Sequence, residues 1–234
     1  MPAEPPRKAS EGDPRIPTWL SWSSGKDSAW SLHRLAASPT HRVVGLLTTI
    51  TDRFARVSMH GVREELLRAQ ARAVGLPVHE VRIPFPCPNE TYERRMGTVV
   101  AQARSEGVGA MAFGDLFLED IRKYRESRLE GTGIAPVFPL WGLDTRALAE
   151  AMIDGGQKAR LVCVDPRKLD ARFAGREFDR RLLGELPEGV DPCGERGEFH
   201  TFVYASPAFA RPVPVRNGDV VERDGFVFAD AIPG

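Results

Sequence analysis

The first half of the chain alternates short apolar runs with longer stretches in which apolar residues recur at helical spacing. Residues 43–49 form a continuous apolar run that predicts a strand buried on both faces. Residues 62–74 carry apolar side chains three and four positions apart, and Gly75 follows, which predicts a helix with a glycine stop. The same alternation predicts strands at 78–83 and 108–113 and helices at 89–106 and 119–129. This order predicts an α/β fold with a five-stranded, doubly wound parallel sheet.

The pattern changes in the second half of the chain. Asp144 is suited to cap a helix that runs to about Gly155, and from Glu198 onward the sequence is mostly β. The pairs Asn217-Gly218 and Asp224-Gly225 predict hairpin turns. We therefore divide the chain into a disordered, Pro-rich tail at 1–16, a nucleotide-binding domain at 17–132, and a smaller α+β domain at 133–234 that closes a substrate cleft.

Composition narrows the class of protein. The formal net charge is zero, which does not favour the broad electrostatic attraction that nucleic acids require. No apolar run has the length of a membrane span, and the N-terminal residues lack the apolar core of a secretion signal, so we expect a cytoplasmic protein. Its three cysteines are far apart in sequence, which argues against a paired-cysteine metal site. A homodimer is compatible with the sequence.

Small and hydroxyl residues gather where the first predicted strand passes into a helix: Ser23, Ser24, Gly25, Lys26, Asp27 and Ser28. Gly25 lets the backbone approach a ligand closely, and the free N–H groups of a helix start favour an anion. The hydroxyls add donors and Lys26 adds a positive charge. The run predicts a phosphate-binding loop. A serine-capped helix start without a ligand is the alternative.

The spacing of this loop excludes a Walker loop. Leu20 stands where that motif has its first glycine, and Asp27 stands where it has Ser or Thr. The run instead resembles the SGGxDS loop of the PP-loop ATP pyrophosphatases, which cleave ATP to AMP and pyrophosphate. Ser24 replaces the glycine that is the second residue of that motif, which is costly for a serine if φ is positive there.

Further candidate residues follow the predicted strands, at the edge where open parallel sheets bind ligands. Thr48 either faces the nucleoside or merely closes its strand, and His60 and Gly61 lie in a loop that either contacts phosphate or is solvated. Gly114 and Asp115 end another strand. Asp115, together with Asp27, is a candidate ligand for Mg²⁺, although acidic residues there also suit a helix start.

A second chemically rich stretch covers residues 191–202, where glycines, carboxylates, a thiol and an imidazole precede a predicted strand. Glu195 and Glu198 are suited to bind an amine or a metal, and His200 is suited to move a proton. A polar turn leading into a hairpin is the alternative. We interpret the stretch as part of the site, with Lys26, Asp27, Glu195, Glu198 and His200 as catalytic candidates.

Four spaced segments together resemble the diphthine–ammonia ligase family, also called the N-type ATP pyrophosphatase or diphthamide synthase domain family. They are SSGKDS at 23–28, GDLFLEDIRKYRE at 114–126, FPLWG at 138–142 and CGERGEFHTFV at 193–203. Glu195, Gly197, Glu198 and Thr201 match the family's EGGEFET-like signature near the substrate. His200 stands where that signature often has Glu, and Arg196 replaces a Gly, which leaves the acceptor open.

The resemblance implies an adenine nucleotide alpha hydrolase-like domain with a second domain over the nucleotide, and ATP and Mg²⁺ as cofactors. It implies that ATP activates a carboxylate as an adenylate and that ammonia then displaces AMP to form an amide. The acceptor is a carboxylate on a small molecule or a protein. Two other hypotheses remain: an RNA-thiolating PP-loop enzyme that uses Cys193 as a sulfur carrier, and a non-catalytic module that binds ATP or AMP.

Overall fold

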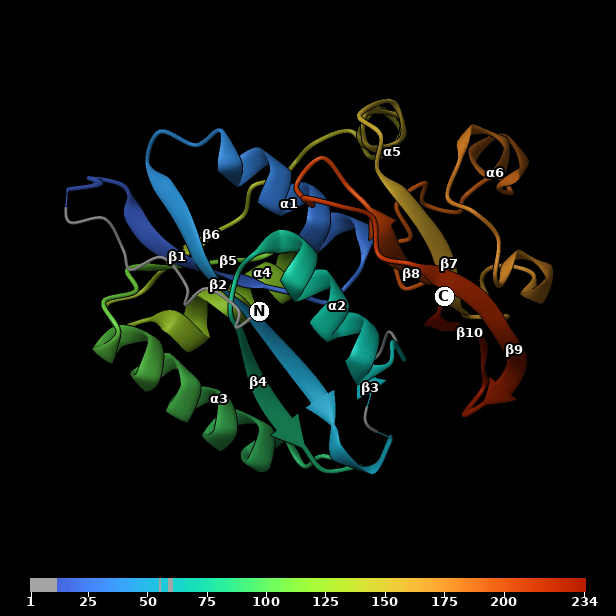
Figure 1. The fold of residues 1–234 in the computed structure, drawn as a ribbon. Coiled ribbons are helices and arrows are strands. Elements are labelled where there is room, and N and C mark those ends of the chain that lie inside the picture. The colour runs from blue at the N-terminus through green and yellow to red at the C-terminus, as the bar shows by residue number, and fades with distance from the viewer. Residues whose placement is uncertain (1–11, 55, 59–60) are drawn as a thin grey trace, which may run out of the picture.

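The computed structural model describes residues 12–54, 56–58 and 61–234, and its first sheet confirms the predicted parallel architecture (Figure 1). The order is β4–β2–β1–β5–β6, and every pairing along it is parallel. The short strand β3 adds antiparallel to the end of β2. The bounds are β1 Ile16–Ser21, β2 His41–Thr51, β3 Arg56–Val57, β4 Val78–Ile83, β5 Ala110–Ala112 and β6 Ala135–Val137. Residues 1–11 of the predicted tail lie outside the described residues.

Helices cover both faces of this sheet because successive strand residues point to opposite sides. Leu20 of β1 packs in the same core as residues of α1 and α2, whereas its neighbour Trp19 packs with residues of α3 and α4. This two-sided burial confirms the doubly wound arrangement. The bounds of the helices are α1 Lys26–Ala36, α2 Glu64–Val74, α3 Asn89–Ser105 and α4 Glu119–Leu129, and a 3₁₀ turn, η1 Asp52–Phe54, follows β2.

The C-terminal part forms a separate antiparallel sheet in the order β8–β7–β10–β9. Asp144 caps the helix before it, as the sequence predicts, by accepting a hydrogen bond from the Ala147 N–H at 2.7 Å. The bounds are α5 Thr145–Asp154, β7 Lys158–Val164, η2 Ala171–Phe173, α6 Arg180–Glu185, β8 Phe199–Ala205, β9 Val215–Arg223 and β10 Phe226–Pro233.

One of the two predicted hairpin turns is wrong. Asn217-Gly218 lies inside β9, where Asn217 pairs with Ala231 and its side-chain oxygen accepts a hydrogen bond from Arg160 at 2.8 Å. Gly218 is useful there because a Cβ atom would lie only 3.1 Å from the Cβ of Asp230. The other turn is confirmed: Asp224 and Gly225 have φ of 52° and 77°, as a tight hairpin requires.

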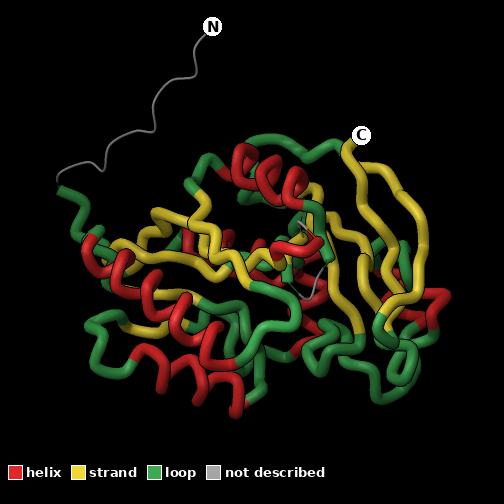
Figure 2. Tube along the Cα trace, turned by 90° about the horizontal axis from the view of Figure 1, so that it is seen from below, coloured by secondary structure: helices red, strands yellow, loops and turns green. Residues whose placement is uncertain are grey.

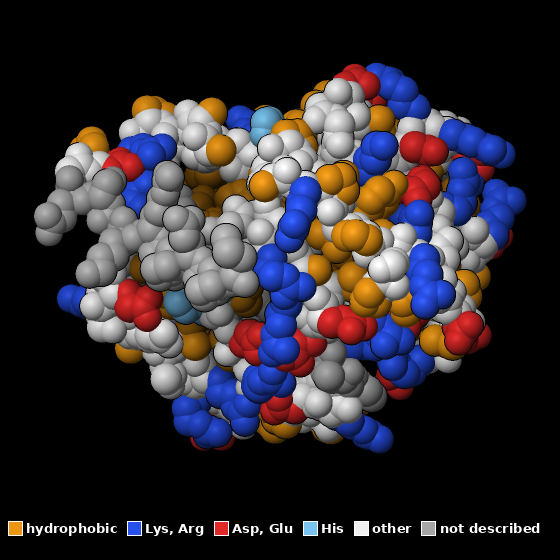
Figure 3. Space-filling view, in the orientation of Figure 1, with side chains coloured by type: hydrophobic (Ala, Val, Ile, Leu, Met, Phe, Trp, Pro, Cys, Tyr) orange, Lys and Arg blue, Asp and Glu red, His pale blue; other side chains and the backbone are white. Residues whose placement is uncertain are grey.

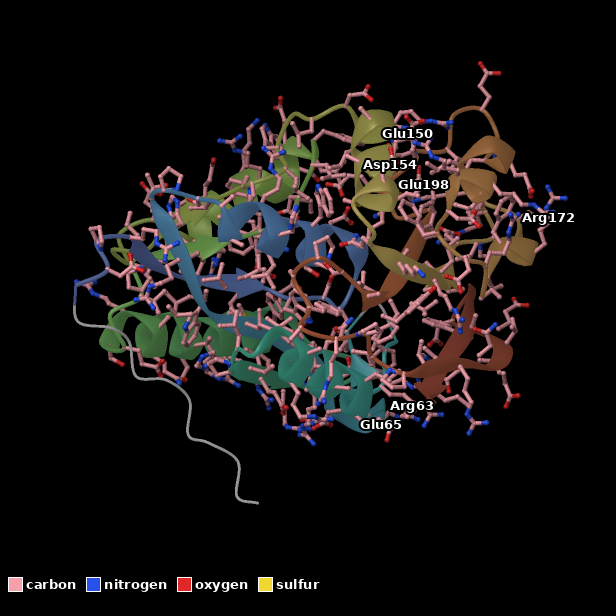
Figure 4. All side chains as sticks on the ribbon, turned by 45° about the horizontal axis from the view of Figure 1, so that its top comes forward. Arg63, Glu65, Glu150, Asp154, Arg172 and Glu198 are labelled. Carbon is pink, nitrogen blue, oxygen red and sulfur yellow. The ribbon has the colours of Figure 1, made fainter. Side chains whose placement is uncertain are left out.

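The two sheets lie next to each other and share one apolar core (Figure 2). Asp230 of β10 forms ion pairs with Arg56 at 2.8 Å and with Arg63, just before α2, at 2.6 Å. Figure 4 shows Arg63 at the edge of the molecule where α2 meets the β9–β10 hairpin. The strand β6 belongs to the first sheet although it follows residue 132, so this sheet extends beyond the predicted domain boundary.

Charged side chains of both signs lie intermixed on the face seen in Figure 3. Ion pairs such as those of Arg68 with Glu64 and Glu80 are typical of such a surface. None of the helices in the described residues is both long and apolar enough to cross a membrane.

Candidate active site

A cavity of about 220 Å³ lies where the start of α1, the end of β5 and the segment before β8 meet. This is the carboxyl edge of the first sheet, at which doubly wound proteins bind ligands. The second domain supplies the opposite wall. The cavity brings together eight of the predicted site residues: Ser23, Lys26, Asp27, Ser28, Gly114, Asp115, Glu195 and His200.

Other predicted residues lie elsewhere. Thr48 is buried, and its hydroxyl donates to the Trp22 carbonyl, so it supports the base of the loop. Glu198 is also buried and accepts a hydrogen bond from the Asp191 N–H at 3.0 Å, in the C-terminal part of the molecule (Figure 4). Gly61 borders a different hollow, next to Phe228. His60 lies outside the described residues.

The phosphate loop has the backbone of an anion site. Gly25 is the N-cap of α1 in an extended conformation, so the first N–H groups of the helix have no partner within it. Ser24 has a positive φ of 69°. This is the conformation that makes a serine costly where the SGGxDS pattern has a glycine. Gln70 holds this conformation: its amide donates to the carbonyls of Ser24 and Val203 at 3.1 and 2.6 Å.

The second domain fixes the loop directly. The Lys26 N–H donates to the Thr201 hydroxyl of β8 at 3.0 Å, and the Val203 N–H donates to the Ser24 carbonyl at 3.0 Å. Gln157 donates to the Lys26 carbonyl at 3.1 Å. The loop is thus shaped by long-range contacts before any ligand binds.

Lys26 and Asp27 form a buried ion pair in the cavity wall, with Nζ and Oδ2 2.7 Å apart. The ammonium group lies over the rings of Phe178 and Phe199, at 5.8 and 5.5 Å from their centroids. Burial alone would lower the pKa of Lys26, but the charge of Asp27 and its neighbours outweighs it and raises that pKa. Burial raises the pKa of Asp27 more than Lys26 lowers it.

Two further carboxylates face the same space. Burial raises the pKa of Asp115 despite the guanidinium of Arg125, whose Nε lies 3.5 Å from Oδ2. Burial also raises the pKa of Glu195 to about 7, against the hydrogen bond that its Oε1 accepts from the Leu116 N–H at 2.8 Å. The charges of Asp27 and Asp115 add to this rise. Glu195 is therefore able to gain or lose a proton near neutral pH.

His200 and Cys193 complete the wall on the side of the second domain. Burial, together with the positive charges of Lys26 and Lys168, lowers the pKa of His200 to about 4. The Cys193 thiol donates to the Thr145 carbonyl at 3.3 Å, and burial raises its pKa. A thiol held in this way is a poor nucleophile, because the thiolate is the reactive form.

The sequence analysis did not identify several residues that shape the cavity. Gln70 and Gln157 position the loop, and Phe113 lines the cavity. Gln70 had a readable signal, because it stands on the apolar stripe of α2 beside Leu66 and Leu67, where a polar residue needs partners. Arg122 stacks on Phe138 and Trp141, which brings the third motif against the second.

The fold and the cavity define a doubly wound α/β protein with a polar cavity at the carboxyl edge of its parallel sheet. The chain belongs to the diphthamide synthase family: residues 18–136 match the N-terminal domain of diphthamide synthase and residues 144–227 match its C-terminal domain. It is similar to the diphthine–ammonia ligases of Bos taurus and Homo sapiens, each 24% identical over 230 residues, which cover 88% of this chain and 85% of theirs. The diphthine–ammonia ligase of Danio rerio is 26% identical over 235 residues, which cover 88% of this chain and 89% of that protein. The chain is thus an enzyme of the ATP-using ligase type.

Proposed function

We propose that this enzyme uses ATP to activate a carboxylate as an adenylate, releases pyrophosphate, and then joins the acyl group to ammonia as an amide. The observation that carries this proposal is the shared cavity, in which the phosphate loop of one domain faces Glu195 of the other. The family match and the similarity to diphthine–ammonia ligases support the same reaction. A cytoplasmic location and a homodimer remain predictions from the sequence.

The cavity fits Mg²⁺ bound together with ATP. Asp27 Oδ1 and Asp115 Oδ2 are buried and have no hydrogen-bond partner in the part of the chain that the structure describes. Within that part, no group of three or more His, Cys, Asp and Glu side chains is arranged to hold a metal ion. Mg²⁺ beside ATP needs only one or two carboxylates, because phosphates and water supply the other oxygens. When bound, Mg²⁺ would neutralise phosphate charge.

The other steps of the proposed reaction are assigned to side chains and backbone groups of the cavity. The N–H groups that follow that of Lys26 at the start of α1 and the hydroxyl of Ser23 bind the phosphates, so that a carboxylate attacks the α-phosphorus without strong charge repulsion. The Ser28 hydroxyl donates to the Gly25 carbonyl at 2.9 Å and so holds the shape of the loop. Lys26 holds Asp27 in place. Glu195 accepts a proton from the attacking ammonia. The sulfur-carrier alternative gains no support from the buried Cys193 thiol.

The decisive variant is Asp27→Asn, compared with Asp219→Asn at an exposed position in β9. We expect Asp27→Asn to lower AMP formation from ATP, Mg²⁺, ammonium and a panel of carboxylates about hundredfold, because it removes the carboxylate that pairs with Lys26 and would hold Mg²⁺ beside the phosphates. Asp219→Asn should retain the wild-type rate. Release of AMP and pyrophosphate is measured. Full turnover by Asp27→Asn would contradict the site, and ATP binding without turnover in the wild type would favour a non-catalytic module.

A further inference from the structure

A second hollow, of about 280 Å³, lies between α3 and α4 and is separate from the phosphate loop. Its apolar lining includes Met96 and Val100 of α3, Met111 of β5, Phe113 and Leu129. The volume lies just below the range for ligand pockets, which runs from about 300 to 1,000 Å³. The hollow therefore suits a small molecule.

The hollow exists because the two helices leave their apolar sides uncovered. Ala103 is the one buried residue of α3 and Leu129 the one buried residue of α4. Tyr92, Met96 and Val100 of α3 are only half-buried. A helix with a partly exposed apolar face next to a pocket is a common setting for a ligand.

The polar groups of the hollow favour an anion. Three arginines line it, Arg104, Arg125 and Arg128, against a single carboxylate, Glu93, which lies 3.2 Å from Arg128. Arg104 donates to the Thr132 carbonyl at 2.8 Å. The guanidinium of Arg125 lies 4.9 Å from the centroid of the Phe113 ring, and its Nε forms an ion pair with Asp115, 3.5 Å from Oδ2, without a hydrogen bond within the described residues. Its other N–H groups can therefore bind a second carboxylate from the side of the hollow.

Phe113 and Arg125 line both this hollow and the reaction cavity, so the two spaces share a wall. We propose that the hollow binds the acceptor, a small apolar carboxylic acid, with its apolar body against Met96, Val100 and Phe113 and its carboxylate at Arg125. The carboxylate then lies at the edge of the reaction cavity, where the nucleotide is activated. This inference rests on the proposed function and adds the substrate class to it.

Direct binding tests the hollow without relying on turnover. The probes are 3-phenylpropionate and hexanoate, with 3-phenylpropanol as a neutral counterpart, measured by calorimetry on the full chain. Gly97→Phe fills the hollow, because Gly97 lines it and a Cβ atom there meets nothing within 4 Å. Thr98→Phe adds the same ring at the next position of α3, which is exposed and does not line the hollow.

We expect at least one acid to bind the wild type about tenfold more tightly than the alcohol, since a charged hydrogen bond is worth more than a neutral one. Gly97→Phe should weaken this binding about tenfold, Thr98→Phe should leave it unchanged, and Arg125→Gln should remove the preference for the acid. The two phenylalanine variants, Gly97→Phe and Thr98→Phe, should keep the wild-type thermal midpoint.

Equal affinity in Gly97→Phe and the wild type would overturn the proposal, as would a wild type that binds neither acid. Loss of α,β-methylene-ATP binding in Gly97→Phe would assign the hollow to the nucleotide instead and would also overturn it. Failure of the proposed function has a different signature: the acids bind, but no AMP forms from ATP in their presence.

Discussion

At the scale of single residues, the phosphate loop carries local strain at Ser24. Its φ of 69° lies in the left-handed region, which costs a residue with a Cβ atom about 1–2 kcal/mol. Its hydroxyl is buried and makes no hydrogen bond within the described residues. We expect Ser24→Gly to raise the free energy of unfolding by roughly 1 kcal/mol, because it relieves both penalties. Urea unfolding measures this.

Ser31 provides the matched control for that change. It is a buried serine in the middle of α1, where a glycine costs about 1 kcal/mol of helix stability. Ser31→Gly should therefore destabilise the protein while Ser24→Gly stabilises it. A loss of stability in both variants would show that the positive φ of Ser24 is not a source of strain.

His200 predicts a pH dependence of stability. Its pKa is about 4 in the folded protein and about 6.5 when exposed, so the unfolded chain binds the proton first. Its contribution to stability is therefore present above pH 6.5 and is lost as the pH falls toward 4. Between pH 7 and 4.5 the wild type should lose roughly 2 kcal/mol more unfolding free energy than His200→Gln. The control variant, His41→Gln, should lose as much unfolding free energy as the wild type. An equal loss in the wild type and His200→Gln would contradict the prediction.

At the scale of elements, the apolar pattern predicted the segments well where burial is local. The strand at 78–83 and the helix at 119–129 have the predicted bounds. Asn217-Gly218 misled because its conformation is set by neighbours, namely the side chain of Arg160 and the close approach of Asp230. A dipeptide such as Asn-Gly indicates that the backbone can adopt a turn there, but contacts with neighbouring side chains determine whether the turn forms.

The sequence predicted the two loops of the site but not that they line one cavity. Reactive residue types revealed the phosphate loop and the 191–202 segment, yet their contact depends on partners far apart in sequence, such as Gln70 and Val203 at a separation of 133 residues. The sequence also could not show which side chains of the second loop face inward. Glu195 enters the cavity, whereas Glu198 is turned toward the Asp191 N–H.

At the scale of the whole molecule, the cavity exists only because two domains meet. The first domain supplies the start of α1 and Asp115, and the second supplies Glu195, His200 and the β8 contacts to Lys26 and Ser24. Such an arrangement allows phosphates to be bound on one wall while proton transfer is carried out from the other. Water exclusion from a reactive adenylate also requires a covered site.

A crystal structure with α,β-methylene-ATP and Mg²⁺ tests this account most directly. The account predicts that the phosphates lie against the N–H groups at the start of α1, with the metal ion between them and the carboxylates of Asp27 and Asp115. A nucleotide bound elsewhere on the molecule, with the segment from Ser23 to Ser28 making no contact to phosphate, would contradict it.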